Sequence, residues 1–192
     1  MPSFALRLSF LVLLAASSCR AFTPSRLEGM LKDTIETMET RGGTGVLKTK
    51  DAEKLLERYT LVRTWYAEGR LESAEDCLYA SLILVTSNQE DDLVAAVQLA
   101  VIAGEAGAAE SNRVQAEAID KLAIAQSRPQ RFGTQYAYSP VLQKWQHYPV
   151  DPKTTDQMRA IMGVPPLRVL QQRVELLNRR LEATKAARAA KE

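Results

Sequence analysis

The amino-acid sequence predicts a mainly α fold: antiparallel helical hairpins in a repeat-like stack, a short irregular β-like hairpin near 132–150 and a C-terminal helix. Apolar residues recur at steps of three and four through most of residues 25–126, which is the spacing of one helix face. Ala, Leu, Glu, Arg and Lys dominate the composition, and all of them favour helix. After residue 127 aromatic and β-forming residues become frequent, which indicates extended segments. The 192-residue chain is long enough for one domain with a substantial core.

The first two helices are expected at 25–40 and 51–67. Asp51 is expected to cap the second helix, and Gly69 to end it. A glycine-rich segment at 41–45 separates the two and lacks the Lys-Ser/Thr pair of a phosphate-binding loop. The apolar faces comprise Leu27, Met30, Leu31, Ile35 and Met38, then Leu55, Leu56, Tyr59, Val62, Trp65 and Tyr66.

Further helices are expected at 71–86, 90–104 and 111–126, and their short links favour antiparallel packing. The segment 65–71 faintly resembles tetratricopeptide-type repeats, but no second copy follows at a fixed period, so a true repeat array is not predicted. The expected core stripes are Leu71, Ala74, Leu78, Leu82 and Val85; Leu93, Val97, Ala100 and Val101; and Val114, Ala118, Leu122 and Ala125.

Beyond residue 127 we expect extended segments at 132–138 and 145–150 with Ser139-Pro140 between them. A short helix at 154–162 follows, capped by Thr154 or Thr155 and ended by Gly163. Pro165-Pro166 opens the last helix, because proline suits the first helical turn.

The last helix carries a short heptad-like stripe, which favours docking onto its own bundle over a dimer seam. The stripe consists of Leu167, Leu170, Val174, Leu177 and Leu181. Its outer face is basic and is expected to be solvated, with contact to an anionic envelope surface as the alternative.

The first residues lie outside the predicted fold. Arg7 precedes an apolar run at 8–16, which is typical of a secretory signal and too short to span a bilayer. We therefore divide the chain into a signal peptide (1–21), an N-terminal helix with a glycine-rich linker (22–50), a helical domain (51–184) and a basic tail (185–192).

The cleavage site has several interpretations. Residues 16–19 resemble a bacterial lipoprotein box, although Ala16 replaces the usual Leu, and this resemblance implies lipidation of Cys19. Cleavage after Ala21 would instead give a secreted protein, and the Ala-Phe-x-Pro that follows also resembles the junction of proteins imported into algal plastids. The expected location is the periplasm or outer cell envelope, with membrane attachment by the lipid alone; secretion and plastid import are the alternatives.

Several function classes are disfavoured. A net charge of +2 without a concentrated basic face argues against nucleic-acid binding. Cys77 is the one cysteine beyond the signal, so we predict a small buried residue rather than a disulfide, metal ligand or catalytic thiol. His147 is the single histidine and is expected to be a partly exposed loop residue. Metalloprotease, Cys-x-x-Cys and serine-hydrolase motifs are absent, and we assign no catalytic residue, metal or cofactor.

The most informative stretch is Arg128-Pro-Gln-Arg-Phe-Gly-Thr-Gln135, which combines a rigid proline, a glycine and several uncharged hydrogen-bonding groups. Such groups are costly to bury unless they are paired, so the stretch is a structural network, a ligand or peptide groove, or a catalytic pocket. We favour the network, in which an Asp–Arg pair holds the Gln and Thr groups. The candidate site residues are Asp120, Arg128, Gln130, Phe132, Gly133, Thr134, Gln135, Asp151 and Arg159.

This stretch, with residues 118–122, 148–152 and 162–167, resembles a bacterial family of unknown function that is recognised by a Pro-Gln-x-Phe/Tyr-Gly-Thr-Gln core. The resemblance covers roughly residues 70–180. It implies a helical protein with a central polar loop, and it carries no activity. The chain departs from the family pattern at Lys121, where the family often has Arg, and at Val85-Thr86, where it often has Gln-His. The missing His favours a structural or binding role.

The sequence therefore predicts an exported helical domain that acts as a non-catalytic protein- or peptide-interaction module of the cell envelope, with an envelope protein or peptide as its partner. The alternative is a small hydrolase-like enzyme, which would bring Asp120, Gln130, Gln135 and Asp151 together around a pocket open to water. The oligomeric state is left open.

Overall fold

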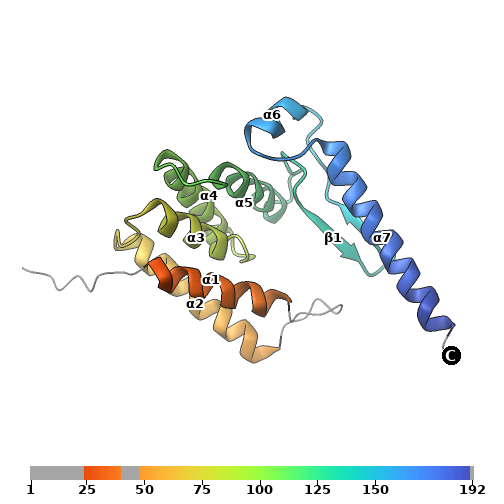
Figure 1. The fold of residues 1–192 in the computed structure, drawn as a ribbon, viewed down its shortest axis with the longest axis horizontal. Helices are drawn as coiled ribbons and strands as arrows, with labels where there is room; N and C mark the ends of the chain where they lie inside the picture. Colours follow the sequence, from red (N-terminus) through yellow and green to blue (C-terminus); the bar gives the residue numbers. More distant parts are fainter. Residues whose placement is uncertain (1–23, 40–47, 191–192) are drawn as a thin grey trace, which may run out of the picture.

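The structure of the protein is a computed structural model that describes residues 24–39 and 48–190. The signal peptide with Cys19, and the glycine-rich segment at 41–45, lie outside the described residues. The expected fold class is confirmed: within the described ranges the chain is mainly helical, with a two-stranded antiparallel sheet and a long C-terminal helix (Figure 1).

The helical stack is formed by the first five described helices. They are α1 (Pro24–Glu39), α2 (Thr49–Ala67), α3 (Ala74–Leu84), α4 (Glu90–Glu105) and α5 (Ser111–Ala125). Figure 1 shows α1 and α2 side by side, with α3, α4 and α5 following in order away from them. Leu27 of α1, Trp65 of α2 and Leu99 of α4 are buried in one core with α3. Helix α1 therefore shares the core of the helices that follow it.

Helix α3 is the centre of this stack, because α1 and α2 cover one side and α4 covers the other. The predicted stripe, which includes Leu78 and Leu82, is therefore not the most buried face of α3. Leu78 and Leu82 are half-buried, whereas Ile83 and Leu84 are fully buried. Cys77 is buried as expected, and this burial, followed by the charge of Asp76, raises the pKa of its thiol.

The helix starts differ from the predicted ones for reasons of capping. Helix α3 begins at Ala74 rather than near 71, because the side chain of Ser73 accepts a hydrogen bond from the backbone N–H of Asp76. The N-cap of α2 is Lys48 rather than Asp51. Asp51 lies in the first turn, where a negative charge interacts favourably with the helix dipole. Thr155 rather than Thr154 caps α6 (Asp156–Ile161), accepting from the backbone N–H of Met158.

The second half of the molecule is a β-hairpin flanked by α7. Strands β1 (Tyr136–Ser139) and β2 (Lys144–His147) pair antiparallel. Both are shorter than the predicted segments. His147 lies in β2 rather than in a loop; it is half-buried, its ring packs edge-on against Tyr136, and neither ring nitrogen has a hydrogen-bond partner among the described residues. Tyr136 and Tyr138 also pack against Trp145, so these aromatic rings contact one another.

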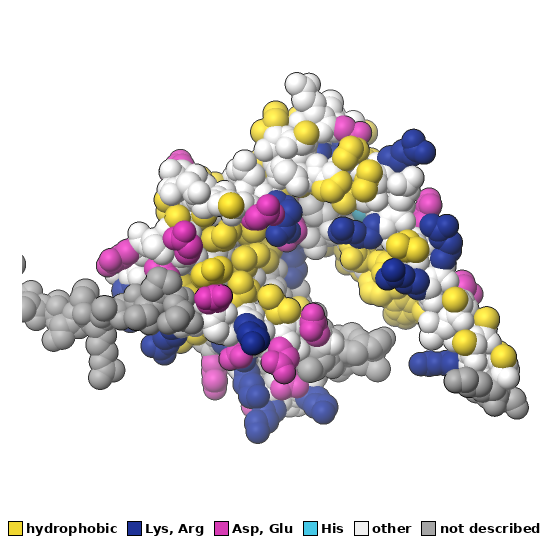
Figure 2. All heavy atoms as spheres, viewed as in Figure 1, with side chains coloured by type: hydrophobic (Ala, Val, Ile, Leu, Met, Phe, Trp, Pro, Cys, Tyr) yellow, Lys and Arg dark blue, Asp and Glu magenta, His cyan; other side chains and the backbone are white. Residues whose placement is uncertain are grey.

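Helix α7 (Leu167–Ala189) docks along the hairpin. Leu170 and Val174 of the predicted stripe are buried, and the side chain of Asn178 bonds the backbone of Trp145 twice: Oδ1 accepts from its N–H at 2.7 Å, and Nδ2 donates to its carbonyl at 3.0 Å. Residues 185–189 of the expected basic tail belong to α7 and are therefore helical. The last turns of α7 form an arm that projects beyond the hairpin (Figure 1). Figure 2 shows the molecule hollowed between this arm and the helical stack. In the described ranges, every helix is too short or too polar to cross a bilayer.

Asn178 should therefore fix α7 on the hairpin. We expect Asn178→Ala to lower the free energy of unfolding by about 1–2 kcal/mol, because two hydrogen bonds to the backbone of Trp145 are lost. Asn178→Asp keeps the acceptor for the N–H but faces the carbonyl of Trp145 with a second acceptor, so it should cost at least as much. Urea unfolding followed by circular dichroism measures both, with Gln171→Ala, which changes an exposed residue of the same helix, as the control. Equal stabilities for Asn178→Ala and Gln171→Ala would contradict this role.

Candidate functional site

The carboxylate of Asp120 organises the motif. It lies on α5, is fully buried, and accepts four hydrogen bonds from the loop that follows the helix. Oδ1 accepts from the backbone N–H groups of Arg131 (2.6 Å) and Phe132 (2.7 Å), and Oδ2 accepts from the backbone N–H (2.8 Å) and hydroxyl (2.8 Å) of Thr134. Charge-assisted bonds of this kind are stronger than neutral ones, so the loop is held tightly against the helix.

Gln130 ties the same loop to the strand that returns from the hairpin. Its side chain is fully buried, and its Nε2 donates to the carbonyls of Gln135 (2.9 Å) and Tyr148 (3.0 Å), while Oε1 accepts from the N–H of Gln135 (2.8 Å). Its backbone also bonds Pro149 and Asp151, as an isolated parallel bridge. Both amide hydrogens, the amide oxygen and the backbone N–H and carbonyl of Gln130 are thereby bonded within the chain.

Gly133 and Phe132 complete the packing of this loop. Gly133 has a φ of 86°, and a Cβ there would lie 3.1 Å from Cδ1 of Leu167, so a larger residue would be strained and crowded. Phe132 is buried in a small second core with Ala116 of α5 and Leu170 of α7. The motif therefore joins the helical stack to α7 through apolar contacts as well as hydrogen bonds.

Arg159 holds the loop from the other side. Its side chain is 2% exposed, and it donates to the carbonyls of Phe132 (2.8 Å) and Thr154 (3.0 Å) and to the carboxylate of Asp156 (2.9 Å). A hydrogen bond from the N–H of Leu167, and then the charge of Arg159, lower the pKa of Asp156. An Asp–Arg pair is present, between Asp156 and Arg159, as expected. It does not hold the Gln and Thr groups, however, because Thr134 is bonded to Asp120 and Gln130 to backbone groups.

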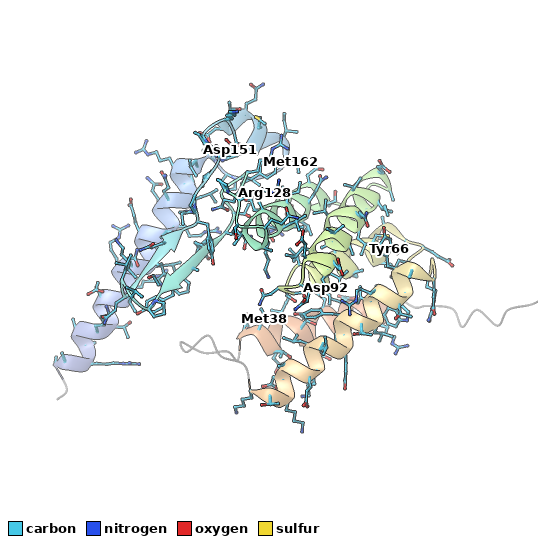
Figure 3. The ribbon with its side chains drawn as sticks, turned by 180° about the vertical axis from the view of Figure 1, so that it is seen from behind. Met38, Tyr66, Asp92, Arg128, Asp151 and Met162 are labelled. Carbon is cyan, nitrogen blue, oxygen red and sulfur yellow. The ribbon has the colours of Figure 1, made fainter. Side chains whose placement is uncertain are left out.

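The remaining predicted residues have different positions. Gln135 donates from Nε2 to the hydroxyl of Thr134 and so extends the network of Asp120. Arg128 is exposed and hydrogen-bonds Gln126, and Asp151 is half-buried and accepts from the N–H of Lys153 at 2.9 Å. Neither Arg128 nor Asp151 joins the buried network; Figure 3 places both where α5 meets the second half of the molecule.

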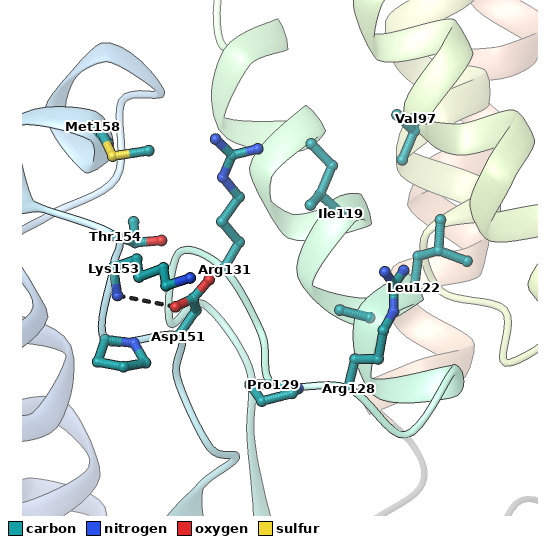
Figure 4. A pocket seen from close by; sticks show the side chains of 12 residues that line it. Val97, Ile119, Leu122, Arg128, Pro129, Arg131, Asp151, Lys153, Thr154 and Met158 are labelled. Atoms are coloured by element: carbon teal, nitrogen blue, oxygen red, sulfur yellow. Dashed lines mark hydrogen bonds between the residues drawn. The ribbon is translucent and has the colours of Figure 1, made fainter.

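A surface groove of about 590 Å³ lies beside the network, between α5 and residues 151–158 (Figure 4). A second hollow of about 280 Å³ shares Ile119, Arg131 and Met158 with it, so the side chain of Arg131 borders both hollows. Sequence reasoning missed most of these lining residues. Leu122 was assigned to the core but is half-buried, because α5 is the last helix of the stack and this side chain lines the groove.

The chemistry available in the groove is limited. Asp151 is the one carboxylate among its lining residues, which include no His, Cys or Ser. No cluster of metal-ligating side chains occurs in the described part of the chain. Nearby on α5, burial raises the pKa of Glu117, while Arg113 and Arg173 oppose this shift. The geometry suits binding better than acid–base catalysis.

Comparison with protein-family models, curated proteins and solved structures gives no match. The resemblance to a family with the same core motif therefore stays a prediction. The positions at which the chain departs from that pattern are in contact, because Nζ of Lys121 donates to the carbonyl of Val85 at 2.8 Å. Lys121 thereby bonds the C-terminal end of α3.

We expect Asp120→Asn to lower the free energy of unfolding by about 2–4 kcal/mol, because an amide group would present its own N–H to buried donors and leave some of them unsatisfied. Asp151→Asn, the matched control on a half-buried carboxylate, should cost less than about 1 kcal/mol. Urea titration of both variants measures the difference. A loss for Asp120→Asn no greater than that for Asp151→Asn would refute the role of the carboxylate.

Proposed function

We propose that this chain is an exported helical domain that serves as a non-catalytic protein- or peptide-interaction module of the cell envelope. One observation carries the proposal: the buried polar groups of the motif are bonded inside the chain, and the surface beside them is a groove. The groove, which Arg128, Pro129 and Arg131 of the motif also line, is the part of this region that a partner can reach.

The buried state of the motif disfavours the hydrolase alternative. An acid or base must come within hydrogen-bond reach of its substrate, yet Asp120 and Gln130 are both fully buried. Gln135 bonds Thr134 rather than a carboxylate. Asp151 is the single carboxylate lining the groove, and it is bonded to the N–H of Lys153.

The build of the groove favours a peptide or protein segment. Apolar side chains line it on both sides, with Ile119 and Leu122 on α5 and Met158 on α6 across from them, and polar groups lie between (Figure 4). Apolar pockets with a few placed polar groups are the usual form of a binding site. Because Asp120, Gln130 and Arg159 hold the loop at 130–135, the wall it forms is ordered before a partner arrives, which lowers the entropic cost of binding.

The location in the envelope is proposed from the signal-like N-terminus, with a lipid anchor on Cys19. In cells that naturally express the protein, we expect the mature chain to begin at Cys19 and to carry a diacylglyceryl group. Mass spectrometry of the N-terminal peptide measures both, and Cys19→Ala, which removes the acceptor thiol, provides the control. An unmodified terminus at Phe22 would exclude the lipid anchor.

Binding in the groove is testable with a photo-crosslinking amino acid. Placed at Leu122 in the full chain within those cells, it should form an adduct with a partner, and Met158→Trp, which narrows the groove, should remove that adduct. The same amino acid at Leu56, which is 57% exposed on α2, is the control position. Adducts of equal yield at Leu56, or an adduct at Leu122 that survives Met158→Trp, would contradict binding in the groove.

A further inference from the structure

We propose that the groove binds an extended acidic peptide segment in which an Asp or Glu lies between apolar side chains. This inference rests on the proposed function and adds the chemistry of the partner to it. It follows from the charges around the groove, the position of Arg131 and the apolar character of the two hollows.

The charges around the groove are mainly positive. Arg128, Arg131 and Lys153 line it, and among the described residues none of these forms an ion pair. Asp151 is the opposing carboxylate, and one of its oxygens already accepts from a backbone N–H. An acidic partner could therefore pair with side-chain cations that form no ion pair among the described residues. Such charge complementarity raises association rates and selects partners.

Arg131 is positioned to receive a carboxylate at the centre of the groove. Its backbone N–H is bonded to Asp120, and its guanidinium lies 5.4 Å from the centroid of the Phe132 ring, over the ring face. Its main chain is thus held, while its side chain is exposed, and the cation–π contact leaves the N–H edges of the guanidinium available. Arginine in this state suits bidentate binding of a carboxylate.

Apolar surface lies on both sides of Arg131. The larger hollow is lined by Ile119, Leu122 and Ala123, which lie on one face of α5 because the second and third follow the first by three and four residues. Met162 and Ile161, the latter 68% exposed, line the smaller one. A peptide passing over Arg131 would therefore place one apolar side chain in each hollow and its acidic side chain between them.

A random peptide display library, selected against the mature full-length chain, tests the inference. The selected peptides should be enriched in Asp and Glu with apolar neighbours. In fluorescence anisotropy, Arg128→Glu with Lys153→Glu should weaken the binding of a selected peptide by at least about tenfold at low salt. Arg131→Gln, which removes the bidentate donor, should weaken it by about as much. Neither Arg128 nor Lys153 contacts Asp120 through its side chain, so the fold should persist, which circular dichroism verifies.

The matched control is Arg179→Glu with Arg180→Glu on α7, which makes the same change in net charge away from the groove and should alter binding less than about twofold. Selected peptides that are not enriched in Asp and Glu would overturn the inference. It would also be overturned if the α7 double variant lost binding while the groove double variant kept it. If either occurs while the crosslink from Leu122 persists, the partner chemistry is wrong and the interaction role stands. If the crosslink is also absent, the proposed function fails as well.

Discussion

The fold depends most on one buried carboxylate. Asp120 is fully buried, and four donors from residues 131–134 converge on it. A buried charge is costly unless it is hydrogen-bonded, so removing these donors would leave the carboxylate in an environment that strongly disfavours it. The loop must therefore fold over the end of α5 for this helix to stay in place. Gln130 applies the same constraint one residue earlier, because its buried amide bonds the backbone of residues 135 and 148.

This constraint joins the two halves of the molecule. The stack of α1 to α5 has its own core, and α7 packs mainly on β2. Between them lie the motif loop and the small core around Phe132, Ala116 and Leu170. At this junction Arg159 donates a hydrogen bond to the carbonyl of Phe132, and Gly133 permits the close approach of Leu167. The walls of the groove are the outer surface of the same junction, so the stability of the motif and the shape of the binding surface have one origin.

The helices were predictable because their apolar spacing is a local property. Asp120 and the motif also stood out, since uncharged polar groups around a proline and a glycine need partners. The partners themselves were not predictable: Asp120 binds mainly backbone N–H groups, which every residue except proline carries and which leave no trace in the sequence. For this reason an Asp–Arg pair was wrongly expected to hold the Gln and Thr groups, although Asp156 and Arg159 do pair. The buried face of α3 was misjudged because both of its sides are covered, and the groove was missed because its walls come from α4, α5 and residues 151–158.

The central claim is that the loop is fastened to Asp120 in the folded protein, and amide hydrogen exchange followed by NMR tests it most directly. The N–H groups of Arg131, Phe132 and Thr134 should exchange only through global unfolding, at rates set by the full stability of the domain. The N–H of Lys153, bonded to the half-buried Asp151, should exchange much faster by local opening. Exchange of the three motif amides as fast as that of Lys153 would contradict the account.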